Sequence, residues 1–452
     1  MVVQKFGGTS VADPEAIRRL IEIARAARAR DGQGPVLVVS AMSGVTDALL
    51  TVAARAGAAQ VDDAIARLGP LRERHLTAIS AVAGNARGHE VAAYINAQFD
   101  ELEAIARALG VLREVSPRTL DAVASIGELL SSRLIAAALE EAGVPATWVD
   151  ARRAIVTDDD HTRAAPLMRE TTTVLRALVT PLIEQGRVPV LGGFVGATRD
   201  GITTTLGRGG SDYSGAIVGA GIDAREIQIW TDVDGMLTAD PRIVPNARLV
   251  PQLSFAEASE LAYFGAKVLH PSTILPAVER SIPVRILNSR RPDGMGTLIV
   301  AQRPENGTPV TALACKRDLT VVDITSSRMF MAYGFLRRLF EVFERFRTAV
   351  DVVTTSEVSV SVTVDDRRHL DAITEALSEF ADVSVEPEMA LLCAVGDRLR
   401  ADASVAARVL RVFEEVPLRM VSQAAARRNI TVVLRQADLP RAMKRLHEEF
   451  FE

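Results

Sequence analysis

Two glycine-rich turns hold the side chains best suited to chemistry in this sequence. The first, KFGGTSV at residues 5–11, sets a lysine beside two glycines and two hydroxyls just before a helix start. The second, TLGRGGSD at residues 205–212, combines an arginine, an aspartate and three glycines. Glycine lets a backbone approach an anion closely, and N–H groups at a helix start can point at its oxygens. The two turns therefore favour binding of phosphate or carboxylate groups.

Each turn also has a purely structural interpretation. A Gly-Gly pair before a helix is a common tight turn, and Ser211 or Asp212 could simply cap the helix that follows. The usual nucleotide motifs are missing from the sequence: it has no GxxxxGK[ST], no kinase HRD or DFG set, and no GxGxxG after a strand. If the chain handles ATP, it uses none of these common designs.

The composition is ordinary for a soluble globular protein and allows two or three domains in 452 residues, with 48% hydrophobic and 24% charged side chains. A net charge of -5 argues against a nucleic-acid partner. Cys315 and Cys393 lie far apart and the six histidines are scattered, so neither a disulfide framework nor a zinc site is indicated. Without a signal segment or a run of about 18 apolar residues, we expect a cytoplasmic protein and no membrane partner.

Strands alternate with helices along the first two thirds of the chain. Residues 2–6 form an apolar strand, and Asp13 with Pro14 begins a helix. A second buried strand lies within residues 35–40, a long helical stretch covers about residues 48–140, and further strands follow in VPATWVD, RVPVLGGFVG and EIQIWTDVDG. This alternation predicts a mostly parallel sheet with helices on both faces. Ligands of such sheets bind at the carboxyl ends of the strands, where the short turns lie.

A Pro-, Gly- and Asn-rich segment at residues 288–312 indicates a domain boundary. Beyond it the pattern is β-α-β-β-α-β, with strands expected at 319–324, 350–354, 358–364 and 383–385 and helices at 335–346 and 368–380. A similar series follows, with helices at 405–413 and 439–450 and strands at 418–421 and 430–434. We therefore predict a first domain over residues 1–295 and two small α+β modules over 305–386 and 387–452, the last strand or helix being free to pack with the first module.

Four long motifs occur in an order that resembles the aspartate kinases, enzymes of the amino-acid kinase fold. They are KFGGTSV at 5–11, TLGRGGSD at 205–212, WTDVDGMLTADPR at 230–242 and FGAKVLHP at 264–271. The segment TTSEVSVSV at 354–362 resembles the first ACT regulatory module of the lysine-sensitive, single-function members. The resemblance runs the length of the chain. It implies an amino-acid kinase domain followed by two ACT-like modules, and a homodimer or homotetramer in which those modules pair their edge strands.

The resemblance further implies an ATP-dependent phosphotransferase that makes 4-phospho-L-aspartate, the first step toward lysine, threonine and methionine. Catalytic roles would fall to Lys5, Gly7, Gly8 and Asp212. The nucleotide would contact Lys5, Phe6, Gly7, Gly8, Thr231, Asp232, Leu237, Asp240, Arg242, Lys267 and Val268. L-Aspartate would contact Ser40, Thr46, Glu128, Phe194, Arg208, Gly209, Gly210 and Ser211, with Arg208 on its α-carboxylate and Glu128 on its α-ammonium.

The implied reaction agrees with what the sequence lacks. The β-carboxylate of aspartate has a pKa of about 3.9, so it is already an anionic nucleophile at neutral pH and needs no general base. The absence of a Ser/His/Asp or Cys/His set is then expected, and catalysis reduces to positioning two anions among cations and N–H groups. Mg²⁺ is expected to bridge the ATP phosphates, with no protein ligand assigned to it.

An amino-acid effector, lysine in particular, would bind in the first ACT-like module. The implied contacts are Met329, Ala332, Gly334, Phe335, Leu336, Ala349, Val350, Asp351, Thr355, Ser356 and Glu357. Relatives commonly carry small hydroxyls where this chain has Ala332 and Ala349, and each missing polar partner would cost on the order of 1 kcal/mol. Asp351 and Glu357 remain as partners for the effector's ammonium, so lysine inhibition is a hypothesis.

Several alternatives stay open. Glu128 lies among apolar residues at helical spacing and could instead pair with Arg133 or cap its helix. Lys267 could be a surface lysine, and Met236-Leu237 stands where relatives often have an aromatic that contacts the nucleotide. The acceptor could be glutamate or N-acetylglutamate, the chain could be a catalytically silent amino-acid sensor, or it could be one part of a fused enzyme.

Overall fold

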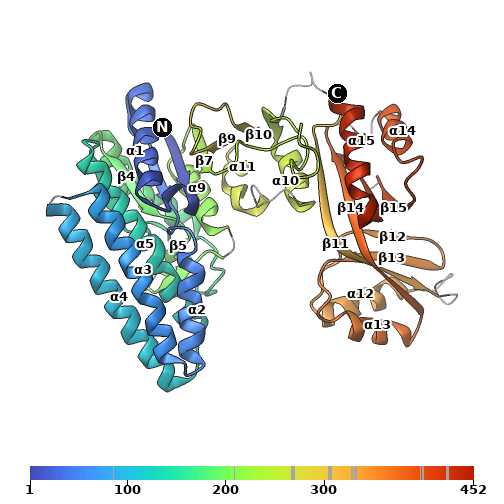
Figure 1. Cartoon of the computed structure of the whole chain (residues 1–452), viewed down its shortest axis with the longest axis horizontal. Helices are drawn as coiled ribbons and strands as arrows, with labels where there is room; N and C mark the ends of the chain where they lie inside the picture. The colour runs from blue at the N-terminus through green and yellow to red at the C-terminus, as the bar shows by residue number, and fades with distance from the viewer. Residues whose placement is uncertain are drawn as a thin grey trace. The chain divides into compact units, whose positions relative to one another are not determined.

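The computed structural model describes residues 1–84, 86–207, 209–265, 270–303, 308–326, 329, 333–397, 399, 402–423 and 427–452 (Figure 1). The chain forms two compact units. The first consists of Met1–Met236, Pro251–Phe255 and Val268–Arg303, and the second of Leu237–Val250, Ala256–Lys267 and Pro304–Glu452.

An eight-stranded sheet forms the centre of the first unit, in the order β3-β4-β2-β1-β7-β9-β10-β8. Every neighbouring pair is parallel except β9 with β10, which confirms the predicted mostly parallel sheet. The strands are β1 (Val2–Phe6), β2 (Val36–Val39), β3 (Ala146–Val149), β4 (Val188–Gly192), β7 (Glu226–Thr231), β8 (Gln252–Ser254), β9 (Val284–Asn288) and β10 (Thr297–Val300). A separate hairpin pairs β5 (Val195–Ala197) with β6 (Thr203–Thr205).

The predicted start of the first helix is confirmed, because Asp13 accepts a hydrogen bond of 2.8 Å from the N–H of Ala16 and Pro14 opens the helix. The long helical stretch divides into four helices, α2 to α5, which pack side by side (Figure 1). The helices up to residue 279 are α1 (Pro14–Asp31), α2 (Val45–Gly57), α3 (Val61–Val82), α4 (Ala86–Leu112), α5 (Pro117–Glu141), α6 (Ala151–Ala154), α7 (Met168–Leu178), α8 (Thr180–Glu184), α9 (Gly210–Gly221), α10 (Phe255–Tyr263) and α11 (Leu275–Glu279), with short 3-10 turns at Gly8–Val11 and Pro271–Ile274.

Helices cover both faces of this sheet. Successive strand residues point to opposite faces. Phe6 therefore points into a core that includes Ile17 of α1 and Leu134 of α5, while Lys5 points toward α9. Within the described residues, α5 is the one helix long and apolar enough to cross a membrane, and 89% of its most apolar window is buried inside the fold. Such burial is typical of a core helix.

The second unit is built on a six-stranded antiparallel sheet in the order β12-β13-β11-β14-β16-β15. Its strands are β11 (Ala312–Thr325), β12 (Val353–Thr355), β13 (Ser359–Val364), β14 (Asp382–Val395), β15 (Leu418–Ser422) and β16 (Asn429–Arg435), and its helices are α12 (Phe335–Arg345), α13 (Leu370–Ser378), α14 (Ala403–Arg411) and α15 (Leu439–Phe451), the last after a 3-10 turn at Gln436–Asp438. The predicted order of elements is confirmed. Strand β14 continues without a break through residues 386 and 387, and the division into two modules at that point stays a prediction.

A segment from the middle of the chain packs into the second unit. Ala239, Ile243 and Val244 lie in the same core as residues of β16 and α15. The Thr238 hydroxyl lies 2.9 Å from Nε2 of buried His447. The motif at residues 230–242 is therefore divided, with its first half in one unit and its second half in the other.

The parallel sheet provides a stability test. Leu37 lies on β2 between β1 and β4 and has 0% exposure. Leu37→Ala should lower the free energy of unfolding by about 2–5 kcal/mol, because it removes buried methyl groups and leaves a cavity. Leu112→Ala, at a position 70% exposed, is the matched control and should change it by less than about 0.5 kcal/mol. Urea denaturation of both variants makes the measurement, and equal losses would contradict the assigned core.

Candidate active site

The carboxyl ends of four neighbouring parallel strands meet at one edge of the first sheet. At this edge, backbone N–H groups of the turns donate hydrogen bonds to the last residues of neighbouring strands. The N–H of Gly7 donates to Trp230 O at 2.9 Å, that of Ser40 to Phe6 O at 3.0 Å, and that of Gly193 to Val39 O at 2.8 Å. These hydrogen bonds hold the Gly7-Gly8 turn against the ends of β2 and β7. The sequence analysis predicted that a ligand would bind at this edge.

A cavity of about 740 Å³ opens at this edge. It brings together residues predicted from widely separated parts of the sequence: Lys5, Ser40, Thr46, Glu128, Phe194, Gly209, Gly210, Ser211 and Asp212. Gly7 and Gly8 lie beside it in the turn after β1, and a Cβ on Gly8 would come within 3.0 Å of Ala41 O. Arg208 lies outside the described residues, so its predicted contact with the substrate stays a prediction.

Lys5 and Asp212 form an ion pair in the cavity wall, with Nζ 2.6 Å from Oδ1. Lys5 is only 7% exposed. A Cβ on Gly215 would lie 3.1 Å from Lys5 Cβ, so this glycine lets α9 pack directly over the lysine stem. Asp212, in the first turn of α9, holds the ammonium in place.

Glu128 is the buried carboxyl group of the cavity, at 3% exposure. Burial raises its pKa to about 8, although the backbone of Ala41, the Thr46 hydroxyl and the charge of Lys5 all favour the ionised form. Its Oε2 has no hydrogen-bond partner among the described residues. An ammonium group entering the cavity would supply the missing donors.

The structural alternatives for Glu128 are wrong. The guanidinium of Arg133 lies over the rings of Tyr94 and Trp148, at 4.2 and 5.1 Å, and is engaged there rather than with Glu128. The cap of α5 is Ser116, whose hydroxyl accepts from the N–H of Thr119. Glu128 is thus free to face the cavity.

Two glycines at the end of β4, Gly192 in the strand and Gly193 directly after it, were not identified from the sequence as site residues. A Cβ on Gly192 would lie 3.0 Å from Glu128 O, and one on Gly193 would lie 2.8 Å from Ser211 Cβ. Phe194 follows with a positive φ of 64°, held by its N–H bond of 2.8 Å to Ser214 Oγ. Close packing at this turn positions both Glu128 and Ser211, and the LGGF sequence is the signal that indicates it.

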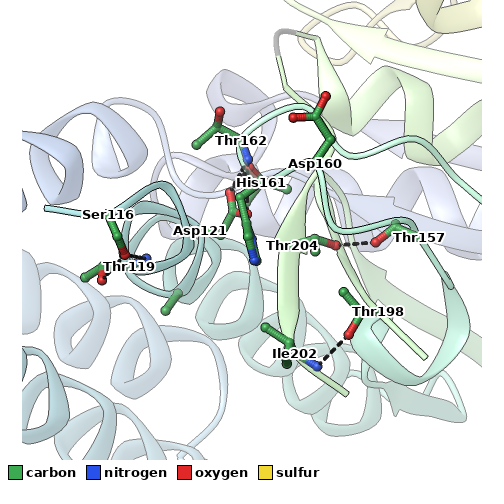
Figure 2. A network of polar contacts seen from close by, with 12 residues as sticks. Ser116, Thr119, Asp121, Thr157, Asp160, His161, Thr162, Thr198, Ile202 and Thr204 are labelled. Carbon is green, nitrogen blue, oxygen red and sulfur yellow. Dashed lines mark hydrogen bonds and ion pairs between the residues drawn. The ribbon is translucent and has the colours of Figure 1, made fainter. Parts of the chain in front are cut away.

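Asp121 was also missed, although it lines the cavity. It precedes Glu128 by seven residues, about two helical turns, and this spacing on one face of α5 was the available signal. Figure 2 shows it beside His161 and Thr162, in a polar network on the cavity wall.

The predicted nucleotide contacts are divided between the two units. The Phe6 side chain is buried and stacked against Trp230, so any contact would come from its backbone. Thr231 and Asp232 lie in the first unit, whereas Leu237, Asp240 and Arg242 lie in the second. Hydrogen bonding from Arg242 lowers the pKa of Asp240. Lys267 and Val268 lie outside the described residues.

The predicted effector residues lie in the second unit, apart from Ala332, which lies outside the described residues. Asp351 is already occupied, because its carboxylate accepts from Lys316 Nζ at 2.8 and 2.9 Å, and the same ammonium lies 2.6 Å from Asp365. Burial raises the pKa of Asp351, while the lysine opposes that shift. Leu336, Ala349, Thr355, Ser356 and Glu357 are exposed, Gly334 has a positive φ, and Met329, Phe335 and Val350 are half-buried.

Comparison with known proteins agrees with this geometry. Residues 1–288 match the amino acid kinase family, and residues 392–450 match the ACT domain. The chain is 37% identical to chloroplastic aspartokinase 3 of Arabidopsis thaliana over 468 residues, which cover 100% of this chain and 81% of that protein. The chain belongs to the aspartokinase family. Lysine-sensitive aspartokinase 3 of Escherichia coli K12 is another such relative, 35% identical over 100% of this chain and 99% of the relative.

Solved aspartokinases confirm the predicted fold class. Escherichia coli aspartokinase III in complex with lysine and aspartate has a TM-score of 0.85 to this structure, at 34% identity and 100% coverage of both chains. The same enzyme with aspartate and ADP has a TM-score of 0.80. The amino-acid kinase fold and the C-terminal ACT-type domain are therefore both present in this aspartokinase.

The pKa of Glu128 predicts a pH-dependent stability. Its pKa is about 8 in the folded state against an ordinary 4.5, so between these values the folded state binds more protons than the unfolded state. The free energy of unfolding of the ligand-free protein should therefore fall as pH rises through this window, by up to about 1.4 kcal/mol per pH unit from this group. Urea denaturation from pH 5 to 8 should show this slope in the wild type but not in Glu128→Gln; parallel curves would contradict the assignment.

Proposed function

We propose that this cavity binds L-aspartate and transfers the γ-phosphate of ATP to its β-carboxylate, giving 4-phospho-L-aspartate. One observation carries the proposal: a buried carboxyl with an unpartnered oxygen, Glu128, shares a cavity with the Lys5–Asp212 ion pair. The first suits an ammonium group and the second a transferring phosphoryl group. Family membership supports the same activity, and the Escherichia coli relative has been solved with aspartate and ADP.

Recognition of aspartate would rest on Glu128. Its unpartnered Oε2 would accept from the α-ammonium, and the new positive charge would favour the ionised carboxylate that burial disfavours. The hydroxyls of Ser40, Thr46 and Ser211 line the same cavity and can orient the substrate. Arg208 remains the proposed partner of the α-carboxylate.

Phosphoryl transfer then needs little covalent help from the protein. A β-carboxylate oxygen forms a bond to the γ-phosphorus while the bond from that phosphorus to the bridging oxygen breaks, and ADP leaves. The Lys5 ammonium can neutralise charge on the transferring group, and the N–H groups of the Gly7-Gly8 turn can donate to it. The described residues bring no three His, Cys, Asp or Glu side chains together as a metal site, so we propose that magnesium arrives with ATP as part of the substrate.

Regulation and assembly are assigned to the ACT-type sheet. Lysine is the proposed effector, because the lysine-sensitive Escherichia coli relative covers the whole chain. Strands β12 and β15 end the six-stranded sheet without a further strand in the described part of the chain. Because exposed sheet edges tend to pair with another chain, these two edges support the proposal of a homodimer or homotetramer. A cytoplasmic location remains a prediction, since the Arabidopsis relatives are chloroplastic.

Acyl-phosphate formation trapped with hydroxylamine tests the activity directly. With MgATP, the protein should give hydroxamate from L-aspartate but not from L-glutamate or N-acetylglutamate. Lys5→Met should lower kcat by at least about a hundredfold, because the developing charge loses its buried cation. Lys444→Met, an exposed lysine on α15, is the matched control and should retain full activity.

The outcomes separate the alternatives. No product from any acceptor would favour a silent amino-acid sensor, and product from glutamate alone would overturn the substrate assignment. Full activity in Lys5→Met would remove that lysine from the catalytic machinery.

The occupied Asp351 makes a prediction about the effector. The Lys316 ammonium already satisfies this carboxylate, so it competes with the ammonium of bound lysine. Lys316→Met should lower the lysine concentration for half-inhibition by about tenfold, which is the effect of removing one charged competitor. A lysine dose-response of the kinase activity measures this, with Lys444→Met again as control. An unchanged curve would show that Asp351 does not bind the effector.

A further inference from the structure

The carboxylate of Asp121 attaches the loop of residues 158–163 to α5. Asp121 on α5 has 0% exposure, and both its oxygens have donors. His161 Nδ1 lies 2.6 Å from Oδ2, the N–H of Thr162 lies 3.0 and 3.1 Å from the two oxygens, and the Thr205 hydroxyl lies 2.5 Å from Oδ1. A buried carboxylate needs such partners to offset its desolvation. Asp121 thereby joins α5, the loop and β6.

Thr162 shows that this attachment holds a strained backbone. Its φ is 72°, in the left-handed region that a β-branched residue rarely occupies. The N–H of this residue is the group that donates to Asp121. Strained residues persist where their surroundings fix them, and they gather at functional sites. Thr162 itself lines the cavity.

The loop of residues 158–163 and the residue after it, Ala164, also contact the chain where it leaves β6. The N–H of Ala164 donates to Thr205 O at 2.9 Å. A Cβ on Gly207 would lie 3.2 Å from Thr162 O and 3.4 Å from Arg163 Cα, so the loop packs directly against this glycine. The next described residues along the chain, Gly209 and Gly210, open the helix that carries Ser211 and Asp212.

We propose that Asp121 is a positioning residue for the amino-acid substrate: by holding the 158–163 loop against α5 and β6, it shapes the cavity wall at Gly207, Gly209, Gly210 and Ser211 for aspartate. The proposal rests on the function proposed above. Asp121 is not needed as a base through His161, because the acceptor carboxylate is already ionised. Its effect should therefore fall on binding of aspartate more than on binding of ATP.

Internal hydrogen bonds suggest that the loop survives loss of this attachment. Asp158 Oδ1 accepts from the N–H of Ala165 at 2.9 Å and from that of Asp160 at 3.3 Å. Asp121→Ala should thus loosen the loop from α5 without melting it. Asp121→Asn keeps an acceptor oxygen for Thr162, and Thr205→Val removes one donor while keeping the side-chain shape.

Steady-state kinetics of these variants, with both substrates varied, make the test. Asp121→Ala should raise the KM for aspartate by about tenfold or more and that for ATP by less than about twofold, with a smaller change in kcat. Asp121→Asn and Thr205→Val should give intermediate increases. Glu140→Ala is the matched control: this carboxylate lies on the same helix, accepts from the N–H of Ala146 and pairs with Arg187, far along α5 from Asp121. It should lower the melting temperature but leave both KM values unchanged.

Each other outcome is decisive. Equal increases in the two KM values, or the same kinetic profile for Asp121→Ala and Glu140→Ala, would show a merely structural role and overturn the proposal. If Asp121→Ala does not fold, an unchanged KM for aspartate in both Asp121→Asn and Thr205→Val would overturn it equally. A wild-type protein that forms no acyl phosphate from aspartate would instead reject the proposed function itself, which separates the two failures.

Discussion

Parallel pairing of β4, β2, β1 and β7 determines where Lys5 and the turns of the site lie. Lys5 is paired with Val38 on one side and Ile229 on the other. Because side chains alternate between the two faces of a sheet, a shift of one residue in this register would turn Lys5 into the apolar core and Phe6 toward α9. The hydrogen bonds that link Gly7, Ser40 and Gly193 to neighbouring strand ends extend this register into the turns. These hydrogen bonds hold the glycine turns of the site against the neighbouring strands.

Three buried ionisable groups in the cavity differ in the partners that they have. Lys5 has an ion-pair partner, Asp121 has a full set of hydrogen-bond donors, and Glu128 retains an oxygen without a described partner. A low local dielectric strengthens each interaction and makes an unpaired group costly. The Glu128 oxygen can therefore gain a hydrogen bond when an ammonium group binds. Lys5 and Asp121 already have their partners and maintain the shape of the cavity.

The sequence alone predicted what depends on local spacing. The strand at residues 2–6 and the helix cap at Asp13 follow from short patterns, whereas cavity residues such as Ser40, Thr46 and Glu128 were expected from the resemblance to the aspartate kinases. Other features depend on contacts between distant residues: Asp121 and Thr205 are separated by 84 positions, and the need for glycine at position 193 comes from Ser211. Pro70 lies inside α3 and not between two helices, so this proline does not mark where the long helical stretch divides into α2 to α5. The division of residues 230–242 between the units arises from apolar packing of Ala239, Ile243 and Val244 that no motif encodes.

That division limits how the protein can be taken apart. The chain leaves the first unit after Met236, returns at Pro251, leaves again after Phe255 and departs for the last time after Arg303. A truncation after Arg303 would remove β16 and α15, and with them the core partners of residues 239–244. The shortened enzyme would expose apolar side chains next to Asp240 and Arg242. A single cut in the chain would thus separate residues that fold together. To exchange regulatory domains between relatives, one would have to transfer Leu237–Val250 and Ala256–Lys267 together with the C-terminal part of the second unit.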